Sequence, residues 1–243
     1  MSTPLVTIIT PTYNRPAMFS ECAAAVLAQS FTDWAWWVVF NTEQWTHGYY
    51  VSMDNLWKDQ RIVPIWYPVL EKERTRFHVP ARIVNWLYPK VTTPYIYWLS
   101  DDDLIDPAGL EALVEASLDE DWDTHEVWAK HDVVYGRCEV VDQQPDGSYT
   151  HGSWCYDSGD VGLGTAIDPH CRLDGGQVLH TADLWRRATA DGWQLTDSKD
   201  AGTSDGVLLH RLAEFARFHY VPTKIVTHRR HAGATHHPPQ VHP

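Results

Sequence analysis

Short apolar runs divide the first half of the chain. Runs rich in β-branched and aromatic residues are typical of buried strands. We predict strands at residues 5–10 (LVTIIT), 36–40 (WWVVF), 61–66 (RIVPIW) and 95–100 (YIYWLS). Pro64 cannot donate a hydrogen bond to a neighbouring strand, so the third strand is placed at an edge of the sheet.

Apolar residues at helical spacing separate these strands. A helix is predicted to begin at Pro16, and its apolar face carries Phe19, Cys22, Ala23, Val26 and Leu27. A second helix is predicted at residues 81–88, and a third after Asp106 and Pro107, which are interpreted as its N-cap and first residue. This alternation predicts an α/β fold with a mostly parallel central sheet flanked by helices.

The pattern changes after residue 120. A hairpin is predicted around residues 133–141 and the turn at 145–147 (PDG). Two helices, at 181–192 and 204–216, and a strand at 218–228 follow. We expect a single domain made of two halves, residues 1–120 and 121–230, followed by a mobile tail at 231–243 without periodicity.

The composition limits the partners. The chain has 243 residues and a formal net charge of −13, which repels nucleic acid over most of the surface, while a local basic pocket for a diphosphate remains open. No apolar run is long enough to cross a bilayer. The four cysteines, which form no CxxC pair, are Cys22, Cys138, Cys155 and Cys171. We expect reduced thiols in a cytoplasmic protein with no transmembrane segment and no nucleic-acid partner.

Three consecutive carboxylates, Asp101 to Asp103, follow the strand at 95–100. They could cap the next helix, form a solvated acidic turn or bind a hard divalent cation. Asp106 already serves as the predicted cap. Ligands of parallel α/β sheets bind beyond the carboxyl ends of the strands, where these aspartates, the loop at 11–15 (PTYNR) and Asn41 all fall. The position therefore favours a metal site.

The segments VTIITPTYNRP and LSDDDLIDPAGLEAL together resemble the inverting glycosyltransferases of family 2, which have the A-type fold. The resemblance covers residues 4–120 well and 174–230 loosely. It implies transfer of a sugar from a nucleotide-diphosphate donor, of the UDP or GDP type, with Mn²⁺ or Mg²⁺ as cofactor. A cation that bridges the diphosphate oxygens would stabilise the negative charge that develops on the leaving group.

The resemblance also implies a donor site at the strand ends. Its implied donor-binding residues are Thr10, Pro11, Tyr13, Arg15, Asn41, Arg82, Asp101 and Asp102. The main chain of Thr10 and Pro11 would lie against the base, and Tyr13 would stack on it. Asn41 stands where the family has acidic residues that read the base edge. The alternative for Tyr13 is a surface aromatic residue. The alternative for Arg15 is an ion pair with a nearby carboxylate, and the alternative for Arg82 is a surface salt bridge.

The metal ligands that the resemblance implies are Asp102, Asp103 and His228, with Asp101 nearer to the ribose. Ser100 occupies the first acidic position of the family's motif, so which aspartate contacts the metal stays open. An imidazole ligand would favour Mn²⁺ over Mg²⁺.

Inversion requires a carboxylate that deprotonates the acceptor hydroxyl. Asp205 matches the family's position for this base, and a helix N-cap is the alternative. Asp174, Gly175 and Gly176 match the acceptor-binding segment, with a glycine turn that binds no ligand as the alternative. The acceptor itself stays open and could be a carbohydrate, a lipid-linked glycan, a protein or a small molecule.

Two other functions remain. A nucleotidyltransferase that forms a nucleotide-sugar shares aspartates at strand ends, but it normally carries a glycine-rich and basic loop, which TPTYNRP lacks. A non-catalytic carbohydrate-binding protein would explain the 13 tryptophans but not the three adjacent aspartates.

Overall fold

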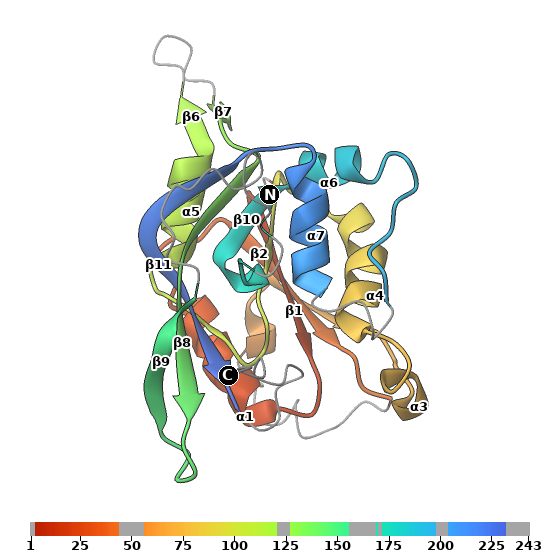
Figure 1. The fold of residues 1–243 in the computed structure, drawn as a ribbon, viewed down its shortest axis with the longest axis vertical. Helices are drawn as coiled ribbons and strands as arrows, with labels where there is room; N and C mark the ends of the chain where they lie inside the picture. The colour runs from red at the N-terminus through yellow and green to blue at the C-terminus, as the bar shows by residue number, and fades with distance from the viewer. Residues whose placement is uncertain are drawn as a thin grey trace, which may run out of the picture.

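The computed structural model describes residues 3–43, 56–120, 127–155, 169, 172–197 and 204–231. The strands of its main sheet are β1 (Val6–Thr12), β2 (Trp34–Phe40), β3 (Ile62–Trp66), β4 (Tyr95–Trp98), β5 (Leu104–Ile105), β8 (Val133–Gln143), β9 (Tyr149–Cys155), β10 (Val178–Thr181) and β11 (Phe218–Arg230). Their order is β3-β2-β1-β4-β10-β8-β11-β5, with β9 paired to β8 (Figure 1). β6 (Leu118–Glu120) and β7 (Val127–Ala129) form a separate pair.

The predicted α/β fold is confirmed. The strands β3, β2, β1 and β4 are parallel, and Ile8 lies opposite Trp36 on one side and Tyr97 on the other. β3 lies at an edge, as Pro64 indicated. β10 was not predicted; it pairs antiparallel with β4 and with β8 and so joins the two halves of the sheet.

Helices cover both faces of the sheet. They are α1 (Pro16–Leu27), α3 (Glu71–Arg74), α4 (Val79–Leu87), α5 (Gly109–Ser117), α6 (Ala182–Ala188) and α7 (Ser204–Ala213), with single turns η1 (Leu56–Lys58), η2 (Tyr88–Lys90) and η3 (Gly175–Gln177). α1 and α5 pack in one core with Ile8, whereas α4, α6 and α7 pack in a second core with Ile9 (Figure 1). Because both faces are buried, the strands read as continuous apolar runs.

The turn that leads from the aspartates into α5 differs from the prediction. Ala108, and not Asp106, is the N-cap of α5. The Oε1 atom of Gln29 accepts a hydrogen bond from the Leu110 N–H at 3.1 Å, and its Nε2 donates to the Asp106 carbonyl at 2.7 Å. The side-chain amide of Gln29, which is distant in the sequence, therefore forms the hydrogen bonds that the backbone needs at the start of α5.

The end of the chain is described up to His231, the first residue of the predicted tail. The rest of that tail, residues 232–243, and Cys171 lie outside the described residues. None of the helices in the described ranges is long and apolar enough to cross a membrane.

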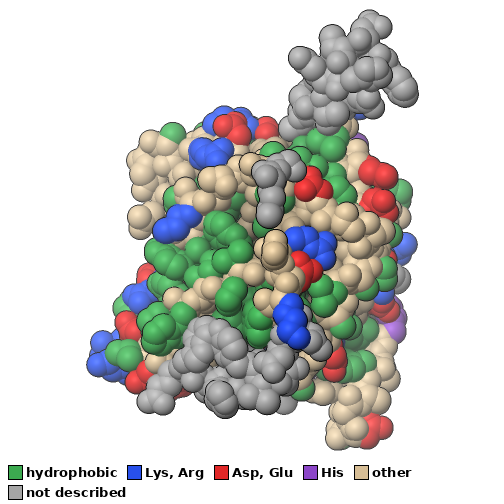
Figure 2. All heavy atoms as spheres, turned by 180° about the vertical axis from the view of Figure 1, so that it is seen from behind, with side chains coloured by type: hydrophobic (Ala, Val, Ile, Leu, Met, Phe, Trp, Pro, Cys, Tyr) green, Lys and Arg blue, Asp and Glu red, His purple; other side chains and the backbone are tan. Residues whose placement is uncertain are grey.

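Hydrophobic side chains gather on the face opposite to that of Figure 1 (Figure 2). Within the described part of the chain, the exposed large hydrophobic residues are Leu27, Val63, Trp66, Leu70, Trp86 and Phe215. Trp34 and Trp36, in contrast, are fully buried. The tryptophans therefore lie on the surface as well as in the core.

We expect Gln29→Leu to lower the free energy of unfolding by about 1–3 kcal/mol, because it leaves the buried amide of Leu110 without a hydrogen-bond acceptor. Urea denaturation would measure the change. Leu27→Gln, at an exposed position near the end of α1, is the control and should change stability little. Equal stabilities of the wild type and Gln29→Leu would show that this amide does not hold the turn.

Candidate functional site

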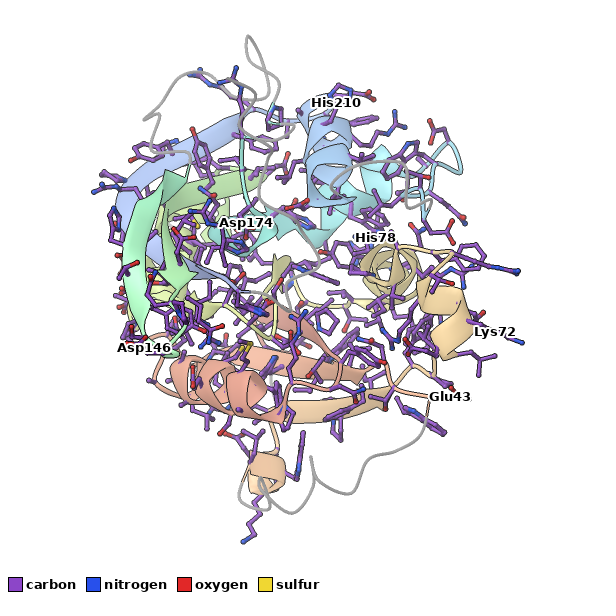
Figure 3. All side chains as sticks on the ribbon, turned by 60° about the horizontal axis from the view of Figure 1, so that its bottom comes forward. Glu43, Lys72, His78, Asp146, Asp174 and His210 are labelled. Carbon is purple, nitrogen blue, oxygen red and sulfur yellow. The ribbon has the colours of Figure 1, made fainter. Side chains whose placement is uncertain are left out.

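The candidate site lies at the carboxyl ends of β1, β2 and β4. Further side chains reach it from the turn η3, the start of α7 and the end of β11. Asp174, which precedes η3, lies near the centre of the molecule, whereas Glu43, Lys72 and Asp146 lie at its periphery (Figure 3). The three polar loops predicted to converge at this edge do meet, since the Tyr13 N–H donates to Asp101 Oδ2 at 3.3 Å and the Asn41 N–H donates to the Thr12 carbonyl oxygen at 3.2 Å.

The three aspartates after β4 are buried. Asp101, Asp102 and Asp103 are 5%, 8% and 1% exposed, which rules out a solvated acidic turn. The Nη1 atom of Arg15 pairs with Asp102 and lies 3.4 Å from Asp101 Oδ1. Burial, together with the neighbouring charge of Asp102, raises the pKa of Asp101 to about 6. The alternative for Arg15, an ion pair with nearby carboxylates, is what the structure shows.

Side chains at and just after the end of β11 contact the same aspartates. The Nε2 atom of His231 lies 3.2 Å from Asp102 Oδ2. Arg229 is 2% exposed; its guanidinium donates to the Asp102 carbonyl and pairs with Glu21. Neither Arg229 nor His231 was assigned a role from the sequence. The sequence pattern that could have indicated their role is the basic run HRRH at residues 228–231, in a chain with a net charge of −13.

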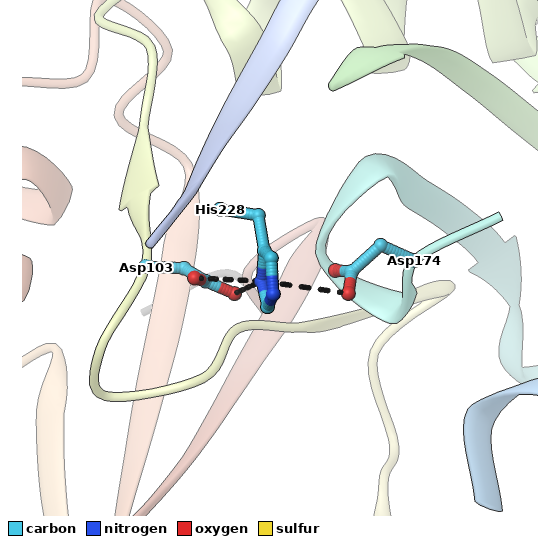
Figure 4. A group of neighbouring side chains, drawn as sticks. All are labelled: Asp103, Asp174 and His228. Atoms are coloured by element: carbon cyan, nitrogen blue, oxygen red, sulfur yellow. Dashed lines mark hydrogen bonds and ion pairs between the residues drawn. The ribbon is translucent and has the colours of Figure 1, made fainter. Parts of the chain in front are cut away.

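Asp103, Asp174 and His228 form a group whose ligand atoms all lie within 4.8 Å of one another. The imidazole lies between the two carboxylates, with Nδ1 at 3.1 Å from Asp103 Oδ1 and 3.7 Å from Asp174 Oδ2 (Figure 4). Burial alone would lower the pKa of His228, but these carboxylates raise it to about 10. Two carboxylates and one imidazole are a donor set that fits Mn²⁺.

The metal ligands predicted from the resemblance are brought together in part. Asp103 and His228 belong to this group, and Asp174, predicted to bind the acceptor, is its third member. The carboxylate of Asp102 lies outside the group and contacts Arg15 and His231 instead. The assignment of Asp102 to the metal stays a prediction.

The residues predicted to bind the base lie together with an arginine that was not predicted. The guanidinium of Arg74 lies 3.4 Å from the ring centroid of Tyr13, and its Nη2 donates to Asn41 Oδ1 at 2.8 Å. The Tyr13 hydroxyl donates to Glu71 Oε2 at 2.6 Å. Arg74 therefore covers one face of the Tyr13 ring. It also occupies the side-chain oxygen of Asn41, so the NH₂ group of Asn41 is the part of that amide left to contact a base.

Thr10 is fully buried, and its hydroxyl accepts a hydrogen bond from the indole of Trp36 at 2.9 Å. This leaves only its main chain for contact with a base, as was predicted for Thr10 and Pro11. That contact stays a prediction.

Arg82 makes the ion pairs that were its alternative assignment. Its Nε lies 2.6 Å from Asp197 Oδ2, and its Nη1 lies 3.6 Å from Glu73 Oε1. It lines an open pocket of about 450 Å³ together with Tyr67, Asn85 and Trp86. A role at the diphosphate stays a prediction.

The predicted acceptor residues and the predicted base are neighbours. A Cβ placed on Gly175 would lie 3.6 Å from the Cβ of Asp205. Asp174 Oδ1 accepts a hydrogen bond from the Gly176 N–H at 2.8 Å, which fixes the turn. α7 begins at Ser204, so Asp205 lies in the first turn of the helix and not at the N-cap.

A small pocket of about 40 Å³ lies beside Asp205 and Gly175. Its other lining residues are Pro80, Val84, Tyr88, Trp98, Val178, His180, Leu195, Leu208 and Leu209. His180 is 4% exposed, and its Nδ1 lies 3.0 Å from the Thr181 carbonyl oxygen. Burial lowers the pKa of His180 to about 4, so the imidazole is neutral at physiological pH.

The fold is similar to that of S. aureus TarS, a glycosyltransferase. The structure of TarS residues 1–349 is 13% identical, with a TM-score of 0.62 over 92% of this chain and 60% of that one. The complex with UDP-GlcNAc is 14% identical, with a TM-score of 0.65 over 94% and 59%. The complex with UDP is 12% identical, with a TM-score of 0.62 over 93% and 60%.

The chain thus spans about 60% of the length of these TarS structures. No protein-family model matches the chain, and no curated protein matches it in sequence. At this identity the likeness shows the fold alone, and membership of glycosyltransferase family 2 stays a prediction.

We expect the free energy of unfolding to fall by about 3 kcal/mol between pH 7 and pH 4 through His180 alone. Its pKa is about 4 in the folded protein and lies near the ordinary value of 6.5 in the unfolded chain. The unfolded chain therefore binds the proton more tightly, and stability present above pH 6.5 is lost as the pH falls towards 4.

Urea denaturation of the wild type and His180→Gln at several pH values measures this contribution. His210→Gln, at an exposed position on α7, controls for the removal of an imidazole. Parallel stability profiles of the wild type and His180→Gln would contradict a buried neutral imidazole.

Proposed function

We propose that this protein is a metal-dependent glycosyltransferase that moves a sugar from a nucleotide-diphosphate donor to an acceptor hydroxyl with inversion. The observation that carries the proposal is the group Asp103, Asp174 and His228 at the carboxyl edge of a glycosyltransferase fold. The UDP-GlcNAc and UDP complexes of the similar TarS structures support a donor of the UDP type, and GDP-sugars are the alternative.

Asp103, Asp174 and His228 would hold Mn²⁺ or Mg²⁺, and the imidazole favours Mn²⁺. Bound there, the cation would stabilise the negative charge that develops on the leaving diphosphate. His228 must release its proton to become a ligand. Its high pKa in this structure reflects the positive charge that the two carboxylates require.

Arginines of the site suit the other parts of the donor. Arg15 presents its guanidinium at the aspartates, where a diphosphate would bind, and guanidinium groups match phosphate oxygens through paired donors. Arg74 and Asn41 present N–H donors at the end of β2, and these suit the carbonyl oxygens of a base.

Asp205 is the proposed base. It lies beside Gly175, and Gly175 follows directly on the proposed metal ligand Asp174. An acceptor that lies against this glycine would place its hydroxyl between the carboxylate of Asp205 and the donor sugar. Transfer of the hydroxyl proton to Asp205 as the new bond forms is general base catalysis.

The proposal is tested with UDP-glucose, UDP-GlcNAc and GDP-mannose, each in Mn²⁺ and in EDTA. Release of the nucleoside diphosphate in Mn²⁺, and its loss in EDTA, is the expected result. Formation of UTP or GTP and a sugar 1-phosphate on addition of pyrophosphate would indicate a nucleotidyltransferase. Absence of nucleoside diphosphate release from any of these donors would contradict a glycosyltransferase that uses these sugars.

We expect Asp103→Asn to weaken UDP binding in the presence of Mn²⁺ by at least about 10-fold, because it removes a charged metal ligand. Calorimetric titration of UDP with and without Mn²⁺ measures the effect. Asp102→Asn tests whether the adjacent aspartate also binds the metal, and Asp183→Asn, on the exposed side of α6, is the control. An unchanged effect of Mn²⁺ in Asp103→Asn would exclude Asp103 as a ligand.

Asp205→Asn should lower the rate of transfer by about 10²–10⁴-fold, since an amide cannot accept the proton of the acceptor hydroxyl. Asn keeps a side-chain oxygen for the Gly206 N–H, which Asp205 binds at 2.9 Å, so the melting temperature should change little. Turnover with Mn²⁺ and the melting temperature are measured on the same preparation. A stable variant with normal turnover would place the base elsewhere.

A further inference from the structure

The pocket beside Asp205 is too small for a sugar ring and too large for one water molecule. Its volume is about 40 Å³, whereas one water occupies about 10–15 Å³ on this measure. A substituent of a few heavy atoms, such as a hydroxymethyl or acetamido group, matches this size. The walls are almost entirely apolar, with the rings of Tyr88 and Trp98 and the side chains of Leu208 and Leu209 among them.

β10 contributes Val178 and His180 to this pocket, and the polar one of the two, His180, carries a hydrogen-bond acceptor. His180 Nδ1 donates to the Thr181 carbonyl, because a carbonyl oxygen can only accept. The neutral ring therefore has its lone pair on Nε2. That atom is buried and has no hydrogen-bond partner within the described part of the chain. A buried acceptor of this kind requires a donor, and neither the hydroxyl of Tyr88 nor the indole N–H of Trp98, the donors carried by the rings in the wall, forms a hydrogen bond with it.

The position of the pocket indicates which molecule brings that donor. Gly175 and Asp205 both line it, and they are the proposed acceptor contact and the proposed base. A group held here belongs to the molecule that lies against Asp205. This argument rests on the proposed function, in which that molecule is the acceptor.

We propose that this pocket is a specificity subsite for a saccharide acceptor. It takes a small substituent that carries a hydroxyl or amide N–H, and this group donates its hydrogen bond to Nε2 of His180. The apolar part of the substituent packs against Tyr88 and Trp98. The subsite recognises a group other than the hydroxyl that reacts.

Two substitutions of His180 separate this role from a structural one. In His180→Asn the side-chain amide keeps a donor near the position of Nδ1 for the Thr181 carbonyl and loses the acceptor in the pocket. In His180→Gln the side-chain oxygen reaches towards the position of Nε2, so the acceptor is kept and the bond to Thr181 is lost. A structural role predicts equal or greater harm from Gln, and the subsite predicts harm from Asn.

Binding is measured by saturation-transfer NMR with UDP and Mn²⁺ present. The probes are D-glucose, D-galactose, D-mannose and N-acetyl-D-glucosamine, with D-xylose as the analogue of glucose that lacks the hydroxymethyl group. We expect at least one hexose to bind and its dissociation constant to rise about 5- to 10-fold in His180→Asn, the usual worth of one hydrogen bond, but to change little in His180→Gln. A hexose held by its hydroxymethyl group should bind more tightly than xylose.

Titrations of the same samples with nucleoside diphosphate separate a failure of the proposed function from a failure of the subsite alone. Absence of binding of both UDP and GDP, titrated in turn, would contradict the proposed function. Normal UDP binding with no saccharide bound, or with equal effects of Asn and Gln, would overturn the subsite alone. A higher KM of His180→Asn for UDP-GlcNAc hydrolysis without an acceptor would assign the pocket to the transferred sugar and overturn its assignment to the acceptor.

Discussion

The burial of three carboxylates beside a fourth at one edge of the sheet is the constraint on which the rest of this structure depends. Asp101, Asp102 and Asp103 are buried, and Asp174 nearby is partly exposed, so the charges of this group must be balanced within the protein. The balancing groups come from the loop before α1 and from the end of β11. Elements from opposite ends of the chain are therefore held together by the charge requirement of the site.

The parallel half of the fold could be predicted because its strands are buried on both faces and read as continuous apolar runs. β10 could not be predicted, since it is four residues long and half of it is His180 and Thr181. These two polar residues are tolerated through partners outside the strand pattern, such as Asp132, which accepts a hydrogen bond from the Thr181 hydroxyl at 2.8 Å. The hydrogen bonds at the start of α5 were missed for a related reason. Gln29 lies 81 residues before Leu110, so no local pattern reveals their contact.

The candidate site was predicted where a motif carries it and missed where only tertiary contact does. From a family resemblance, Asp103 and His228 were named as metal ligands and Asp174 as an acceptor residue, and the three lie together. Arg74 reaches Tyr13 and Asn41 across 61 and 33 residues, and no local spacing reveals such a contact. The contacts of Arg82 follow its alternative assignment, a salt bridge, because Asp197 lies beside it in the folded chain.

Asp174 uses its two oxygen atoms in two directions. Oδ1 holds the backbone of the turn that carries Gly175 and Gly176, and Oδ2 faces His228. A cation that binds one oxygen of Asp174 therefore also affects the backbone turn that is hydrogen-bonded to the other oxygen. Such linkage is reciprocal in free energy: if a cation at Oδ2 tightens the turn and favours the acceptor, the acceptor must favour the cation by the same factor. One carboxylate would then couple the binding of the nucleotide with its cation to the binding of the acceptor, whichever of them binds first.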